Sequence, residues 1–285
     1  MALDNSLSTY TNRRKYRLAS LDTALRNMTV AEAIVVVDRG DGKYIDSPYG
    51  DQSTATVSSI TGTYSVGVFG THDDLLTITD QFVKSDHIYA NDRAFSNFDL
   101  MANRLDESNY AITVALDQWA LCNLLTDGTG TYSTPSGGFT TAANIITIMA
   151  NLNSKYAGYS EAQKGTFLVI ENTDLVGFEI AQATNGYNTA DSVLNNGFYR
   201  HFMGTDIYVV RSGTFVTSTL GTKSVVASGH RVAGVKGLAT LAIRDMGYVE
   251  KEVSGKTGFE QETHCFAGFC LWTPRASLII DITIV

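Results

Sequence analysis

The longest periodic pattern in the chain predicts one long helix over residues 97–126. Its apolar positions recur at intervals of three, four or seven residues and therefore share one stripe of a helix: Phe98, Met101, Leu105, Ile112, Leu116 and Trp119. Ser96 and Asp99 have the spacing of a capping box, and Asp127-Gly128 ends the pattern. Such a helix is roughly 45 Å long at 1.5 Å per residue, so the subunit should be extended.

Before this helix the pattern changes to β structure. The apolar run Ala33–Val37 meets residues 38–42, Asp-Arg-Gly-Asp-Gly, in which Asp-Gly favours a tight turn, so a hairpin or extended loop should begin there. Between residues 53 and 79, 11 of 27 positions are Ser or Thr, and Tyr64, Val66 and Val68 alternate as in a strand. A ribbon of this kind is marginal alone in water, so it should pack on a further surface, such as another subunit.

The first 32 residues are mostly polar and basic. Leu18, Leu21 and Leu25 have a helical spacing that is too thin to bury a face on its own. We therefore predict an N-terminal arm over residues 1–32.

After the long helix the pattern predicts an α/β unit. The Gly-rich residues 128–138 indicate a loop and a subdomain boundary. A helix follows, with Thr140 or Thr141 as cap and Gly158 as stop; its apolar face comprises Ile145, Ile148, Met149, Leu152 and Tyr156. Strands are expected at 166–171 and 205–211, with a short helix between them that is capped at 172–174 and runs to about 184. Residues 223–228, 259–272 and 276–285 look like strands, while 229–245 is ambiguous.

Composition and charge exclude several classes of protein. The net charge is −8, but residues 1–30 carry five bases and two acids, which leaves −11 on the rest. A body this acidic argues against sequence-independent binding of nucleic acid. The charged fraction of 18% is low, and buried interfaces are depleted in charge, so assembly is expected. The longest uninterrupted apolar block, Ala33–Val37, is far too short to span a membrane, and no secretion signal is evident, so an intracellular protein is expected.

Candidate metal and phosphate sites are weak. Residues 229–234 have the glycine spacing of a phosphate-binding loop, but Lys236 comes one place late. His264, Cys265 and Cys270 are zinc-ligand types, but positions 265 and 270 are an odd interval apart and should face opposite sides of a strand. A buried pair of structural cysteines is the better interpretation. Because only three cysteines occur, widely placed, we expect reduced thiols.

Candidate catalytic and binding residues also have simpler interpretations. Ser228 and His230 with an Asp could form a hydrolytic set, but the nucleophile-elbow motif is absent, and a turn histidine bonded to backbone is favoured. The basic residues 13–17 favour contact with an acidic neighbouring subunit over phosphate, and Trp119 and Trp272 favour core or interface anchors. No catalytic, cofactor-binding or metal-binding residue is assigned, and an enzyme is not expected.

Taken in order, these elements resemble the tailed-bacteriophage major capsid protein family, whose fold is shared by encapsulins. Local resemblance is found in Gly204–Val210, Val226–Arg231 and Cys270–Ala276. The resemblance implies an α+β capsid fold: residues 1–32 are an N-terminal arm, 33–90 an extended loop, 91–139 and 231–285 a peripheral domain with a long spine helix, and 140–230 an axial α/β domain.

The same resemblance implies a function. The chain would assemble as pentamers and hexamers into an icosahedral shell around double-stranded DNA, in a virion built in the host cytoplasm. The implied partners are copies of itself, a scaffolding protein, a portal and decoration proteins; neither a membrane nor a cofactor is expected. A separate scaffolding protein is expected because no acidic leading segment precedes residue 1, although a cleaved precursor would look the same. Lys43 and Lys84 lie in the loop range, but no crosslink is predicted. The alternatives are an encapsulin shell and, third, an α/β hydrolase.

Overall fold

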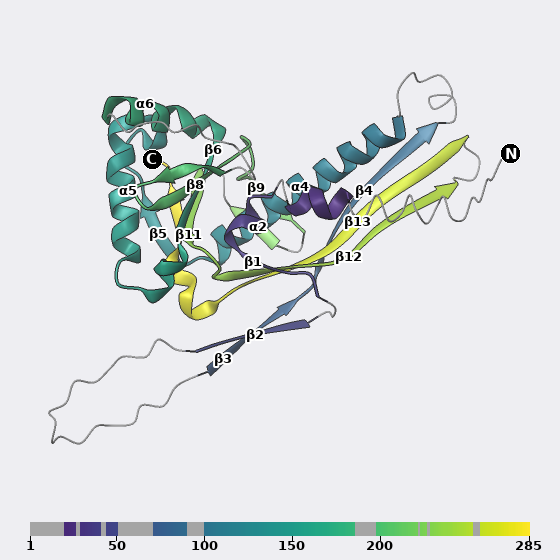
Figure 1. Cartoon of the computed structure of the whole chain (residues 1–285), viewed down its shortest axis with the longest axis horizontal. Coiled ribbons are helices and arrows are strands. Elements are labelled where there is room, and N and C mark those ends of the chain that lie inside the picture. The colour runs from purple at the N-terminus through teal and green to yellow at the C-terminus, as the bar shows by residue number, and fades with distance from the viewer. Residues whose placement is uncertain are drawn as a thin grey trace.

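The computed structural model describes residues 20–26, 29–40, 44–50, 71–89, 100–185, 198–221, 223–226, 229–252 and 257–285. In these ranges the chain forms a four-stranded sheet, a six-stranded sheet and two two-stranded ribbons, together with several helices. This mixture confirms the predicted α+β class. Figure 1 shows that the six-stranded sheet and helices α5 and α6 make one lobe, from which the four-stranded sheet and helix α4 extend. The ribbon β2–β3 projects in a different direction.

The extended part of the molecule is a long sheet backed by one long helix. Its strand order is β1 (Val36–Asp38), β12 (Ala239–Glu252), β13 (Gly258–Leu271) and β4 (Asp80–Tyr89). β1 runs parallel to β12, and the other pairs are antiparallel. Strands of this length alternate in burial along β13, as a sheet with one covered face requires.

Helix α4 (Leu100–Asp127) covers that face and confirms the predicted long helix. Ile112, Leu116 and Trp119 are buried as the stripe predicts, and the Trp119 ring meets Phe82 and Phe269 edge-on at 5.6 and 6.1 Å. The helix ends at Asp127, before Gly128, as predicted. The proposed capping box and Phe98 lie outside the described residues, as do the side chains of Met101 and Leu105.

The second lobe is built on the six-stranded sheet. Its order is β5 (Gly130–Ser133), β14 (Ile279–Thr283), β11 (His230–Val235), β6 (Thr166–Glu171), β8 (Thr205–Val210) and β7 (Phe198–Phe202). β6 is buried at every position, which explains its continuous apolar run. Gly234 is required by packing, since a Cβ there would lie 2.5 Å from the Ile279 side chain and 3.1 Å from the Phe167 ring.

Two helices of this lobe match their sequence patterns. Helix α5 (Ala142–Tyr156) buries the five predicted side chains, but the Thr141 side chain makes no capping bond although it occupies the N-cap. Helix α6 (Leu175–Asn185) follows the 3-10 turn η3 (Asn172–Asp174), in which Glu171 and Asp174 form a capping box. The remaining 3-10 turns are η1 (Gly138–Thr140), η2 (Ser160–Lys164) and η4 (Thr273–Leu278).

A buried arginine supports the start of α6. Arg231 Nε donates to Asp174 Oδ2 at 2.5 Å, and its Nη2 donates to Glu171 Oε2 at 3.2 Å. Glu171 Oε1 also accepts the backbone N–H groups of Gly213 and Phe215 at 3.1 and 3.3 Å. Because these buried charges are paired and hydrogen-bonded, the cluster fixes the loop after β8 rather than offering a reactive group.

The ambiguous region 229–245 is β structure. It contains β11 and the first part of β12, and residues 230–234 lie in β11 and not in a phosphate-binding loop, as the late position of Lys236 indicated. The predicted strand at 223–228 appears as β10 (Lys223–Val226), which pairs with β9 (Thr217–Leu220).

The predicted domain ranges contribute to both sheets. β11, apart from its first residue His230, and β14 fall in the range 231–285 and lie in the six-stranded sheet, whereas β12 and β13 from the same range lie in the four-stranded one. β4, from the range 33–90, pairs with β13. The domain boundaries therefore stay a prediction, while the two sheets describe the architecture.

Candidate functional site

The ribbon that projects from the body is an antiparallel hairpin. β2 (Tyr44–Gly50) pairs with β3 (Thr71–Thr77), from Tyr44 opposite Thr77 to Gly50 opposite Thr71. This pairing confirms that a hairpin begins after residues 38–42. Because a two-stranded ribbon has little stability of its own, the contacts at its root decide its direction. The candidate functional site is therefore the hairpin root, the set of contacts where residues 36–40 leave the body and residues 76–80 return to it.

The outgoing strand is fastened to β12 by Arg244. Its Nη2 pairs with Asp38 Oδ2 at 3.0 Å, and its Nη1 donates to the backbone oxygen of Asp38 at 2.7 Å. Asp38 Oδ1 accepts the Gly40 N–H at 2.7 Å, and this bond, with Arg244, holds the pKa of Asp38 below its ordinary value. Asp38 therefore stays ionised and tied to the sheet while the chain turns at Gly40.

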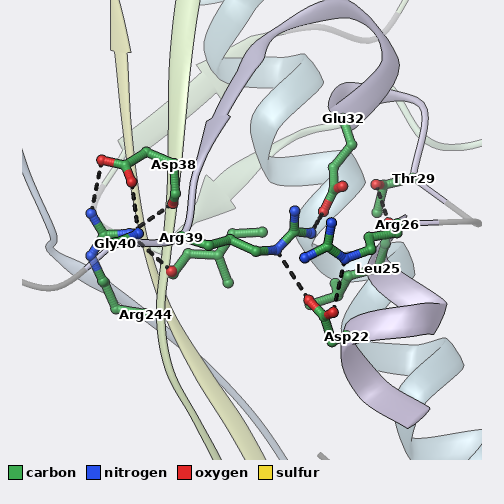
Figure 2. A network of polar contacts seen from close by, with 10 residues as sticks. Asp22, Leu25, Arg26, Thr29, Glu32, Asp38, Arg39, Gly40 and Arg244 are labelled. Carbon is green, nitrogen blue, oxygen red and sulfur yellow. Dashed lines mark hydrogen bonds and ion pairs between the residues drawn. The ribbon is translucent and has the colours of Figure 1, made fainter. Parts of the chain in front are cut away.

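The next residue, Arg39, is fastened to the opposite side. Its guanidinium forms ion pairs with Glu32 and with Asp22 Oδ1, the latter at 3.2 Å. Figure 2 shows Asp38 and Arg39 pointing in opposite directions, toward Arg244 on one side and toward Asp22 and Glu32 on the other. Glu32 is only 8% exposed, and burial raises its pKa although Arg39 opposes the shift. The chain entering the hairpin is thus held from two sides by different parts of the sequence.

Both partners of Arg39 belong to a segment that lies along α4. This N-terminal segment, residues 20–34, contains helical residues 20–26 and helix α2 (Ala31–Ile34), and it buries Leu21 and Leu25 completely. Two leucines are enough to form a buried face here, because α4 and the rest of the core pack against them. Thr29 Oγ1 donates to Leu25 O at 2.6 Å and links the two helical pieces.

Three polar side chains lie at intervals of four on α4, and the first and last of them bond to this segment. Asn109 Nδ2 donates to Ser20 Oγ at 3.0 Å, buried Thr113 donates to Asn109 O, and Asp117 Oδ1 accepts the Ala31 N–H at 2.7 Å. Burial raises the pKa of Asp117 to about 7, against the lowering effect of the Ala31 and Val30 N–H groups at the start of α2. Asp117 thereby caps a helix that belongs to another part of the chain.

The returning strand packs closely against Gly268 of β13. A Cβ at Gly268 would lie 2.7 Å from Thr77 O and 3.1 Å from Ile78 Cα, so only glycine lets the backbones approach this closely. Beside it, Leu76 is buried whereas Leu75 is 58% exposed. Ala242 is the cross-strand partner of Gly268, two residues before Arg244, so both strands of the hairpin are anchored on one stretch of the sheet.

A bulge in the long sheet lies next to this anchor. Two residues of β12, 245 and 246, stand between the pairs Arg244–Phe266 and Gly247–His264, and Asp245 has a φ of +44°. A bulge increases local twist and redirects the strand that carries it. The root of the hairpin therefore coincides with the point where the long sheet changes direction.

The candidate metal ligands do not converge. Cys265 is buried, while its neighbours His264 and Cys270 are only partly buried, which confirms the parity argument but leaves Cys265 as the one fully buried member of the predicted pair. The His264 ring stacks over Gly247 and pairs with Glu262 at 3.4 Å. Burial raises the pKa of the Cys265 thiol to about 12. All three cysteines are free, and within the described ranges no three His, Cys, Asp or Glu side chains gather as metal ligands would.

The candidate hydrolytic residues are only partly placed. His230 begins β11, and its Nδ1 lies 2.6 Å from Asp281 Oδ1, so its partner is a carboxylate instead of the predicted backbone group. Ser228, Lys43 and the basic residues 13–17 lie outside the described residues. Lys84 pairs with Asp86 at 3.0 Å, and Trp119 is a core anchor, as predicted. Trp272, partly buried, lies under the Lys164 ammonium.

Sequence reasoning missed Glu32, Asp117 and Arg244 as parts of the hairpin root. The signal that could have revealed one of them is the spacing of Asn109, Thr113 and Asp117, which places polar side chains on one line beside the apolar stripe. In the part of the chain described, no helix is long and apolar enough to cross a bilayer.

No known family's sequence profile matches the chain, and no curated protein matches it either. Solved structures do match. The chain is similar to the capsid of the cyanophage P-SCSP1u, with a TM-score of 0.65 and 12% identity over 91% of this chain and 89% of that one. It is similar to a protein of Mycobacterium phage Che8, with a TM-score of 0.61 and 12% identity over 90% and 91% of the two chains.

The virus-like particle from Pyrococcus furiosus is also similar, with a TM-score of 0.62 and 10% identity over 95% of this chain and 99% of that one. Each of these matches spans nearly the whole of both chains at an identity that shows the fold alone. The chain therefore has the fold of the tailed-bacteriophage major capsid proteins, as its sequence resemblance implied.

Proposed function

We propose that this chain is a major capsid protein that assembles into an icosahedral shell enclosing double-stranded DNA of a tailed bacteriophage. The observation that carries the proposal is the match to a phage capsid chain over about nine tenths of both chains. A shell subunit needs contacts that repeat between identical copies, and a projecting hairpin reaches beyond its own body to a neighbour.

The exposed apolar side chains support contacts between copies. Leu75 on the hairpin, Val83 and Tyr89 on β4, and Tyr110 on α4 are each about half exposed. These four lie on the parts of the molecule that extend away from the six-stranded lobe, while Val176 and Ile180 are exposed on α6 of that lobe. Apolar side chains that gather in one patch are typical of surfaces that become buried on association.

The finer features of the proposal follow from the same fold. Copies would be arranged as pentamers and hexamers, and a scaffolding protein, a portal and decoration proteins would be its partners in a virion assembled in the host cytoplasm. The acidic net charge would keep packaged DNA from adhering to the shell. The role is structural and not enzymatic, with residues 1–32, 33–90, 91–139 with 231–285, and 140–230 as arm, loop, peripheral and axial parts.

The experiment is negative-stain electron microscopy and sedimentation of the purified full-length protein. The proposal predicts closed particles of uniform size with a mass in the megadalton range. A protein that sediments as a monomer of 30.9 kDa across buffers and concentrations would overturn it. DNA protected from nuclease inside particles made with the remaining phage proteins would complete the test.

A second candidate is a cellular shell of the encapsulin type, which encloses a protein cargo. The match to the Pyrococcus furiosus virus-like particle, with the highest coverage of both chains among the three structures described, favours keeping this candidate. Particles that co-purify with one cargo enzyme and contain no protected DNA would decide for it.

A further inference from the structure

Two arginines hold the hairpin root, and they differ in what they join. Arg244 joins Asp38 to the sheet, so it fixes the point at which the hairpin leaves the body. Arg39 joins the next residue to Asp22 and Glu32, which belong to the N-terminal segment. Figure 2 shows the two contacts on opposite sides of the same stretch of chain.

From this arrangement we infer that Asp22, Glu32 and Arg39 form a releasable latch that sets the direction of the hairpin, while Asp38 and Arg244 form the fixed anchor about which it turns. Gly40, directly after the latch, allows the backbone to turn when the Arg39 contact opens. The latch is an inference from geometry alone; its consequence for assembly, the choice of neighbour that the hairpin reaches, rests on the proposed function.

The two contacts are built to differ in strength. Arg244 is 9% exposed, against 33% for Asp38, and binds both the carboxylate and the backbone oxygen of Asp38, so opening this contact removes two acceptors from a largely buried guanidinium. Arg39 is 19% exposed and Asp22 is 29% exposed, so water can replace each of them as the partner of the other when the latch opens. Glu32 is 8% exposed, so its ionised carboxylate keeps the latch closed and its protonation removes the buried charge that opening would leave behind. With Glu32 protonated, the latch therefore opens at a lower cost than the anchor.

The same two contacts differ in their response to acid. The charged groups around Glu32 are Arg39, Asp22 and Arg26 from the N-terminal side and Asp117 from α4. Burial raises the pKa of Glu32, whereas the pKa of Asp38 is held below its ordinary value. As the pH falls, Glu32 is therefore neutralised first, which removes one partner of Arg39 while the Asp38–Arg244 pair remains.

Protonation of Glu32 does not lower the stability of the folded subunit. A carboxyl group whose pKa is raised on folding binds its proton more tightly in the folded state, so protonation favours that state. Mild acid should open the latch in a subunit that remains folded. Opening in acid without loss of folding distinguishes a latch from an ion pair that only stabilises the fold.

The test measures the direction of the hairpin in the full-length protein. Spin labels are placed at Leu75→Cys on β3 and Ser154→Cys on α5, both exposed, with Cys270→Ser to prevent stray labelling. Labelled copies are diluted among unlabelled ones, so that pulsed electron resonance reports distances within one copy. The inference predicts one narrow distance distribution for the parent protein near neutral pH.

Removing the latch should abolish the single narrow distance distribution. Arg39→Gln and the isosteric Glu32→Gln are expected to broaden the distribution or add a second population. Arg39→Lys should restore it in part, since one ammonium group reaches one carboxylate but not both. Arg104→Gln is the matched control: Arg104 forms an exposed ion pair with Glu107 on α4 at 3.0 Å and should leave the distribution unchanged.

The pH profile completes the test. The distance distribution of the parent should broaden on acidification, that of Glu32→Gln should not change with pH, and that of Asp117→Asn should still respond. If Glu32→Gln stays as narrow as Arg104→Gln at every pH, the inference is overturned, even if Arg39→Gln fails to fold. Particles in micrographs with an unchanged distribution would refute the latch alone, whereas a broadened distribution in a strictly monomeric protein would refute only the shell function.

Discussion

Asp117 on α4 leads to a prediction whose sign depends on pH. Burial raises its pKa from 3.8 to about 7, while its Oδ1 accepts the Ala31 N–H at 2.7 Å. An acid whose pKa is higher in the folded state destabilises folding once it is ionised there, so the free energy of unfolding falls as the pH rises from about 4 toward 7. At 1.4 kcal/mol for each pKa unit, this one group accounts for at most about 4 kcal/mol.

Asp117→Asn removes this dependence without changing the shape of the side chain. The amide oxygen can still accept the Ala31 N–H, and any weakening of the contact at Val30 costs the same at every pH. The stability of the variant relative to the parent should therefore increase by about 2 to 3 kcal/mol between about pH 5 and pH 8. In thermal unfolding this corresponds to a relative shift of roughly 4–6 °C for a chain of this length.

The assay is a series of thermal scans of both proteins in the same assembly state, confirmed by sedimentation at each pH. Asp106→Asn, an equivalent change at an exposed position of the same helix, is the control and should track the parent. Curves for Asp117→Asn and the parent that stay parallel from pH 5 to pH 8 would show that the carboxyl group carries no buried charge.

Three further predictions concern packing and thiol access. Gly268→Ala should lower the free energy of unfolding by about 1–3 kcal/mol in chemical denaturation, because the new Cβ would lie 2.7 Å from Thr77 O. Trp119→Ala should cost about 3–5 kcal/mol, read as a lower melting temperature, because the ring is buried against two phenylalanines. Cys265 should resist alkylation in the native protein while Cys270 reacts, as mass spectrometry of the digested protein would show, because Cys265 is buried and burial raises the pKa of its thiol to about 12.

Each of these has an internal control. Trp272→Ala removes a partly buried indole and should cost less than Trp119→Ala. Denaturation should make Cys265 and Cys270 equally reactive. Equal reactivity in the native protein, or no loss of stability in Gly268→Ala, would contradict the packing described around β13.

The elements that could be predicted from the sequence are those set by local rules. The apolar face of α5 is predicted correctly because its five residues at helical spacing all face the core. β6 is predicted correctly because a short continuous apolar run fits a strand buried on both faces. The end of α4 follows from Asp127-Gly128. Each of these signals lies within a few residues of the feature it predicts.

The strands in the ambiguous region 229–245 could not be predicted, because their sequence pattern is not the one that local rules recognise. β11 is buried at five of its six positions, and Ala239–Ile243 of β12 is buried throughout. A strand covered on both faces has no alternation of apolar and polar residues, so its period is hidden. The partner of His230 was missed because Asp281 is 51 residues away, and only the pairing of β11 with β14 brings them together.

The hairpin root depends on the same kind of long-range contact. Arg244 reaches Asp38 across 206 residues, and Asp117 reaches Ala31 across 86, so neither pair has a local signature. The choice of charged groups at this point has a physical consequence. Apolar side chains would hold the root with comparable or greater stability, but apolar contact is non-directional, whereas an ion pair fixes the orientation of both partners. In the proposed shell, a hairpin that reaches one neighbour among several needs a defined direction more than a stronger attachment, and the two oppositely directed arginine contacts at Asp38 and Arg39 supply it.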